Sequence, residues 1–84
     1  MRELLLKQLN RFIYGTEELH TSGEGNSEIW KIVSIPRGKT LMTVEFQKHR
    51  IYLYNHLGDK YYFDYPTSEG ELGNLTTFII TTKR

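Results

Sequence analysis

Residues 40–65 read TLMTVEFQKHRIYLYNHLGDKYYFDY, and this stretch decides the fold of the chain. Apolar and polar side chains alternate along most of it, in runs rich in β-branched and aromatic residues. A polar break at residues 47–50 and a Leu-Gly-Asp turn at residues 57–59 separate these runs from one another. The pattern therefore predicts three antiparallel strands joined by two hairpins.

The first break predicts a hairpin that turns on Lys48 and His49. Directly opposed residues of an antiparallel pair point to the same face of the sheet, so this turn sets Phe46 opposite Ile51. One face of the pair then carries only apolar residues, which are Met42, Val44, Phe46, Ile51 and Leu53. That agreement supports the hairpin, although its turn residues are chemically poor turn formers.

Two registers are open for the second hairpin, and they differ in where its aromatic rings go. A two-residue turn places five aromatic side chains together on the outer face. A three-residue loop shifts the register by one residue, so that Phe63 joins the aliphatic core. We expect the three-residue loop, because a small domain does not easily leave so many aromatic side chains in water. Tyr52, Tyr54, Tyr62 and Asp64 then lie on the face away from the core.

A helix and two further strands are expected outside this stretch. Apolar residues between 2 and 14 recur at the spacing of one amphipathic helical face, and they are Leu5, Leu6, Leu9, Phe12 and Ile13. Gly15 follows where a left-handed helix cap belongs. Residues 16–27 are polar, acidic and rich in glycine, which predicts a loop. The strands are expected at residues 29–35, 40–47, 50–56, 60–65 and 75–82.

Together these elements predict one small α+β domain over residues 1–84. An N-terminal amphipathic helix is followed by a five-stranded antiparallel sheet, with four strands in a meander and the fifth returning after residues 66–73. Two architectures fit: an open sheet with the helix on one face, or a sheet bent into a small barrel. The barrel resembles the general layout of Sm-like RNA-binding proteins, in an N-terminal helix plus five short strands. The chain carries no Sm signature, so the resemblance is topological and carries no function.

Composition narrows the class of protein. The chain has 84 residues, no cysteine, a formal charge of +1 and 38% hydrophobic residues. The lack of cysteine excludes thiol chemistry, and no apolar run approaches the ~18 residues that span a bilayer. The leucine run at residues 4–6 is too short for the apolar stretch of a signal peptide. We therefore expect a cytoplasmic protein with no cofactor and no membrane partner.

Charge is distributed unevenly along the chain. Residues 15–28 carry four glutamates and neither lysine nor arginine, whereas residues 29–50 carry five basic residues against Glu45. These basic residues are Lys31, Arg37, Lys39, Lys48 and Arg50. The pI of about 8.0 lies below the value of about 9 that is typical of dedicated nucleic-acid-binding domains. An acidic segment is thus followed by a basic region that adjoins a band of tyrosines.

The tyrosines supply the functional prediction. Tyrosine joins a flat apolar ring to a polar tip, which suits surfaces that exchange water for a partner. We expect a non-enzymatic inhibitor, adaptor or regulator that binds a protein partner or a second copy of itself. The alternative is single-stranded nucleic acid, with bases stacked on the rings and phosphates bound by basic side chains. The expected binding residues are Tyr52, Tyr54, Tyr62, Arg37, Lys39, Lys48 and Arg50.

No catalytic or metal site is predicted. His20, His49 and His56 do not have the spacing of metal ligands. His49 or His56 could meet Glu45 or Lys60 in space, and such a set can cleave RNA by general acid and base catalysis. A small ribonuclease is therefore the third alternative, and solvent-exposed turn histidines are the simpler interpretation.

Overall fold

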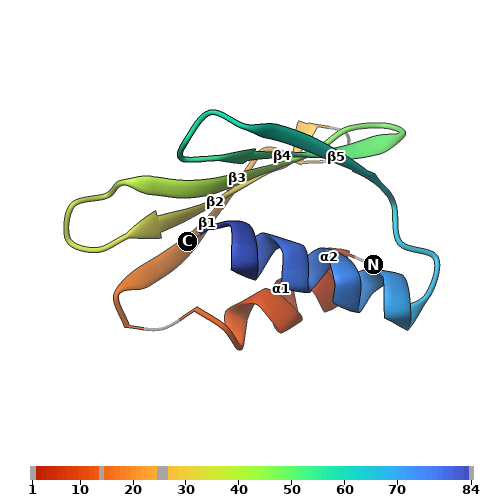
Figure 1. Cartoon of the computed structure of the whole chain (residues 1–84), viewed down its shortest axis with the longest axis horizontal. Coiled ribbons are helices and arrows are strands. Elements are labelled where there is room, and N and C mark those ends of the chain that lie inside the picture. The colour runs from red at the N-terminus through yellow and green to blue at the C-terminus, as the bar shows by residue number, and fades with distance from the viewer. Residues whose placement is uncertain (1, 14, 25–26, 84) are drawn as a thin grey trace.

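The computed structural model describes residues 2–13, 15–24 and 27–83, and Figure 1 shows how their helices and strands are arranged. The elements in chain order are α1 (Arg2–Asn10), β1 (Glu17–Ser22), β2 (Ile29–Ser34), β3 (Thr40–Phe46), β4 (Arg50–Asn55), β5 (Lys60–Asp64) and α2 (Glu69–Thr82). The strands form one five-stranded antiparallel sheet in the order β1-β2-β3-β4-β5. The expected α+β class, with an N-terminal helix and a five-stranded antiparallel sheet, is confirmed, and all five strands form one meander that includes β1 in place of the strand expected at residues 75–82.

Both helices cover the same face of the sheet, and the core lies between these two layers (Figure 1). α1 contributes Leu5 and Leu9 to the core, and α2 contributes Leu72, Leu75 and Ile79. The sheet contributes alternate residues of its central strands, which are Trp30, Ile32, Met42, Val44, Phe46, Ile51 and Leu53. Their side chains are almost completely buried, and this burial is the main source of stability in a chain without disulfides.

The sheet is open rather than closed into a barrel. β1 and β5 form its two edges and do not pair with each other. The two helices bury the apolar face of the sheet, so the sheet does not need to close on itself to form a core. The likeness to the Sm-like layout therefore ends at an N-terminal helix and the number of strands.

The prediction of a strand at residues 75–82 is wrong, because this segment forms most of α2. Its β-branched side chains favour a strand locally, but tertiary packing overrides that preference. The hydroxyl of Ser68 accepts a hydrogen bond of 3.2 Å from the backbone N–H of Glu71 and caps the helix. Leu72, Leu75 and Ile79 then point into the core at helical spacing. Ser68 and Glu71 also have the S-x-x-E spacing that often marks a helix start.

The prediction of a loop over residues 16–27 is wrong for residues 17–22, which form β1. This strand pairs with β2 from Glu17 opposite Ser34 to Ser22 opposite Ile29. Leu19 is its only apolar residue. A strand at the edge of a sheet can form with so few apolar side chains because only one of its faces packs on the core, and the sequence pattern of this strand is therefore weak. Residues 25 and 26 of the expected loop lie outside the described residues.

The N-terminal helix ends earlier than expected, at Asn10. The N–H groups of Arg11 and Phe12 bond to carbonyls three residues back, at 3.2 and 3.0 Å, which tightens the last turn. Gly15 lies five residues beyond Asn10, so it is not the predicted cap of this helix. Tyr14, the last residue of the expected helix, lies outside the described residues.

Both predicted hairpin registers are confirmed, and each of the four strands from β2 to β5 ends one residue before its expected end. Phe46 lies opposite Ile51 in the first hairpin, and Ile51 lies opposite Phe63 in the second. The second hairpin closes with a three-residue loop after Asn55, whose backbone N–H donates to the carbonyl of Asp59 at 3.1 Å. Tyr52, Tyr54, Tyr62 and Asp64 accordingly share the face away from the helices.

Ion pairs join the two ends of the helix layer to β1 and to the residue before β2. Lys83, just after α2, contacts the carboxylate of Glu17 on β1, and the two side chains are 7% and 16% exposed. Arg2 on α1 donates to Glu28 at 2.9 Å and to the hydroxyl of Tyr65 at 3.4 Å. Burial lowers the pKa of Arg2, but the hydrogen bonds to Tyr65 and Glu28 raise it, and the resulting pKa is above its ordinary value.

Candidate partner-binding face

The face of the sheet away from the helices, here called the outer face, collects most of the predicted binding residues. The strand registers assign it the alternate residues Glu18, His20, Ser22, Ile29, Lys31, Val33, Thr43, Glu45, Arg50, Tyr52, Tyr54, Lys60, Tyr62 and Asp64. No helix in the described part of the chain covers this face (Figure 1). The outer face is therefore the large sheet surface that the core leaves available to a partner.

Three tyrosines lie together at the β4–β5 side of the outer face. Tyr52 lies directly opposite Tyr62, and Tyr54 lies opposite Lys60. Tyr62 is 61% exposed, and Tyr52 and Tyr54 are half-buried. The predicted grouping of Tyr52, Tyr54 and Tyr62 on one face is therefore found, and their role in binding stays a prediction.

Two cations lie over these rings. The guanidinium of Arg50 lies 4.6 Å from the ring centroid of Tyr62. The ammonium of Lys60 lies 4.8 Å from the ring centroid of Tyr52 and 5.6 Å from that of Tyr54. Such contacts hold rings and cations in one arrangement and contribute about 0.5–1 kcal/mol each at exposed sites. The sequence predicts a role for Lys60 only in the ribonuclease set, because the contact of Lys60 with the rings depends on its pairing with Tyr54.

A carboxylate also lies among the tyrosines. Glu45 is opposite Tyr52 across the β3–β4 pair. Its two oxygens accept hydrogen bonds from the hydroxyl of Tyr54 at 3.2 Å and from Nε2 of Gln47 at 2.7 Å. The outer face therefore combines aromatic rings with charges of both signs, and a phosphate placed at its centre would meet the negative charge of Glu45.

The predicted basic residues divide between two ends of the sheet. Lys48 lies in the β3–β4 turn and Arg50 begins β4, close to the tyrosines. The guanidinium of Arg50 also lies 4.0 Å from the carboxylate of Asp64. Arg37 and Lys39 lie in the β2–β3 turn, at the opposite end of β3 from Lys48. The structure therefore brings Arg50 to the tyrosines and leaves Arg37 and Lys39 apart from Lys48.

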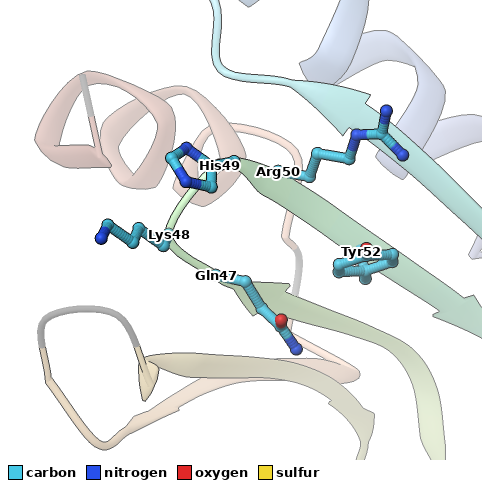
Figure 2. A pocket seen from close by; sticks show the side chains of 5 residues that line it. All are labelled: Gln47, Lys48, His49, Arg50 and Tyr52. Carbon is cyan, nitrogen blue, oxygen red and sulfur yellow. The ribbon is translucent and has the colours of Figure 1, made fainter.

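The β3–β4 turn borders a shallow hollow of about 290 Å³, which Figure 2 shows from close by. It is lined by Gln47, Lys48, His49, Arg50 and Tyr52. The side chains of Lys48 and Arg50 extend in different directions rather than converging (Figure 2). An anion-binding site needs hydrogen-bond donors that converge on one point. This hollow therefore extends the outer face but does not form a phosphate-binding site.

The histidines are not brought together. His49 precedes β4 and His56 follows it, so the length of the strand separates them. His20 lies on β1, at the far side of the sheet, with Nε2 3.6 Å from the carboxylate of Glu18. Within the residues that the structure describes, no group of three histidine or acidic side chains could hold a metal ion. The geometry therefore gives no support to a ribonuclease that uses both His49 and His56.

Comparisons with known proteins give no match: no family model fits the chain, and neither the curated proteins nor the solved structures contain a significantly similar one. None of the helices in the described ranges is long and apolar enough to cross a membrane. The functional argument therefore rests on the outer face itself.

Proposed function

We propose that the chain is a non-enzymatic binding domain whose outer face engages a protein partner, as an inhibitor, adaptor or regulator. The observation that carries the proposal is the group of Tyr52, Tyr54 and Tyr62 on a sheet face that the helices leave uncovered. Tyrosine and arginine are enriched at protein interfaces, where they supply large contact areas with polar tips.

The charges of the outer face indicate the chemistry of the partner. The carboxylates of Glu45 and Asp64 already face donors or cations of the same molecule. Lys31 and Lys60 extend from the same face and have exposed side chains, and Lys48 lies exposed in the adjoining turn. A partner surface that places carboxylates beside apolar groups would complement both the cations and the rings.

Protein binding is favoured over nucleic-acid binding because of Glu45 and the separation of the basic residues. A stacking platform for single strands works with a positively charged track for the backbone. Here Glu45 lies among the rings, and Arg37 and Lys39 lie at the other end of β3 from Lys48. Binding of single-stranded nucleic acid is therefore the alternative that the experiment below also tests.

The test compares two variants of the whole chain as baits in quantitative capture from cell extract. The first carries Tyr52→Thr, Tyr54→Thr and Tyr62→Thr, since threonine retains a preference for strands. The matched control is Phe12→Ser, which removes an exposed aromatic ring from the helix side of the molecule. Each captured protein is then purified and its binding to the wild type and both variants is measured directly.

We expect to purify a partner that binds the wild type and Phe12→Ser with equal affinity. The same partner should not bind the triple tyrosine variant. Equal binding of every purified partner to all three proteins would contradict the proposal. Titration with single-stranded oligonucleotides at two salt concentrations completes the test. Tight binding that weakens steeply with salt would favour the nucleic-acid alternative, because phosphate contacts release counterions.

A further inference from the structure

The edge strand β5 presents backbone groups to a further strand. The N–H of Asn55 bonds to the carbonyl of Asp59, and the same register makes Tyr61 and Phe63 the residues whose backbone groups bond to β4. The backbone groups of Lys60, Tyr62 and Asp64 therefore point away from β4. Among the described strands, none pairs with this side of β5.

We propose that β5 pairs antiparallel with β5 of a second copy, about a two-fold axis at Tyr62. This pairing aligns the outward-facing backbone groups of Lys60, Tyr62 and Asp64 and forms about six hydrogen bonds. It joins the two sheets into one. The inference goes beyond the proposed function and does not depend on it.

The side chains of β5 are complementary in this pairing. The strand reads KYYFD, with a cation at one end, an anion at the other and three aromatic rings between them. Antiparallel self-pairing sets Lys60 opposite Asp64 of the second copy, and the reverse contact occurs by symmetry. On the outer face, Tyr62 lies opposite Tyr62 of the second copy. On the core face, Tyr61 lies opposite Phe63 of the second copy.

Other registers lose this complementarity. A shift that preserves both the hydrogen-bond pattern and the face of each side chain must move the partner by two residues. One such shift sets Lys60 opposite Tyr62. The other sets Lys60 opposite Pro66, which has no N–H to donate. The register centred on Tyr62 is therefore the one in which both charges meet an opposite charge.

The two edges of the sheet differ in this respect. β1 begins with Glu17 and Glu18 and contains no lysine or arginine, and like charges along an edge discourage pairing with another strand. On β5 the charges have opposite signs and occupy the positions that oppose each other in self-pairing. We therefore assign the pairing edge to β5.

The flank of α2 that contacts β5 carries few bulky side chains. The ring of Phe78 on α2 lies 4.9 Å from the ring centroids of both Tyr61 and Phe63. Beside Phe78, α2 carries small polar side chains, and together they line a hollow of about 360 Å³. These neighbours are Asn74, Thr77, Thr81 and Thr82. Bulky side chains on this flank would instead keep a second helix away.

A two-fold axis perpendicular to the joined sheet keeps both helix layers on one side and both outer faces on the other. The tyrosines of the two copies then form one continuous surface. Because the pairing strand has only five residues, the interface is smaller than those of stable dimers, and the association is reversible and concentration-dependent.

Sedimentation velocity over a concentration series tests this pairing in the full chain. We expect reversible dimerisation of the wild type. Lys60→Glu alone, or Asp64→Lys alone, sets like charges opposite each other at two places and should weaken the dimer roughly tenfold. Combining the two substitutions restores opposite charges and should restore the dimer. The matched control is Lys31→Glu, the same charge reversal on the outer face away from the edge, which should dimerise like the wild type.

A second measurement identifies the edge directly. Hydrogen exchange at the Tyr62 amide should slow as protein concentration rises, because this N–H is bonded only in the dimer. A wild type that stays monomeric at every concentration, or a dimer that both single substitutions leave intact, would overturn the proposal. So would a dimer that is lost on Tyr52→Thr with Tyr54→Thr but retained by Lys60→Glu, since that pattern places self-association on the outer face.

Discussion

Tyr52 and Tyr62 lie directly opposite each other on the outer face, and each ring has a cation from its own hairpin over it. Lys60 lies over Tyr52, and Arg50 lies over Tyr62. The hairpin therefore orders an aromatic surface outside the core.

The Tyr52–Tyr62 pair should be energetically coupled. Aromatic pairs contribute about 0.5–1.5 kcal/mol beyond the burial of the separate rings. A double-mutant cycle of Tyr52→Ala and Tyr62→Ala, measured by urea unfolding, should give a coupling free energy of about 0.5 kcal/mol or more. Strictly additive losses of unfolding free energy would show that the rings do not interact in solution.

The cap at Ser68 should be needed for α2. Ser68→Ala removes the acceptor of the Glu71 N–H and should lower the free energy of unfolding by about 1 kcal/mol. Thr77→Ala serves as the control, because Thr77 is an exposed residue of the same helix and its loss should change stability by less than about 0.5 kcal/mol. Equal effects of the two substitutions in chemical denaturation would contradict this assignment.

The contact between Lys83 and Glu17 should stabilise the fold substantially. Lys83→Ala leaves the carboxylate of Glu17 largely buried without its cation and should cost about 3 kcal/mol. Lys39→Ala removes an exposed lysine from a turn and should have little effect. The double variant Lys83→Met with Glu17→Met should recover part of the loss, because no unpaired charge remains. Thermal and urea unfolding of the four proteins measure these differences.

Two glycines should respond with opposite sign to substitution by alanine. Gly58 has a φ of +88° and Gly73 lies within α2, and a Cβ at either position meets nothing within 4 Å. Gly58→Ala should destabilise by about 1 kcal/mol, because alanine rarely adopts this backbone conformation. Gly73→Ala should stabilise by up to about 1 kcal/mol through helix propensity. Equal signs in urea unfolding would contradict the assigned turn or helix.

The central hairpins could be predicted from sequence because their alternation, turn lengths and aromatic content agree. α2 could not, since its last residues, from Thr76 to Thr82, are mostly β-branched and the Ser68 cap is a weak local signal. β1 could not either, because only Leu19 marks a buried side. At the candidate site, alternation predicted that the tyrosines share a face. The position of Lys60 over Tyr52 depends on three-dimensional side-chain placement, which periodicity does not contain.

Binding of a protein partner at the outer face is the central proposal, and one measurement tests it most directly. The isotope-labelled chain is titrated with a partner purified by the capture experiment, and amide chemical shifts are followed. We predict that the largest changes lie on the alternate outer-face residues of β3, β4 and β5, around Tyr52, Tyr54 and Tyr62. Changes confined to α1 and α2, with the outer face unaffected, would contradict the account.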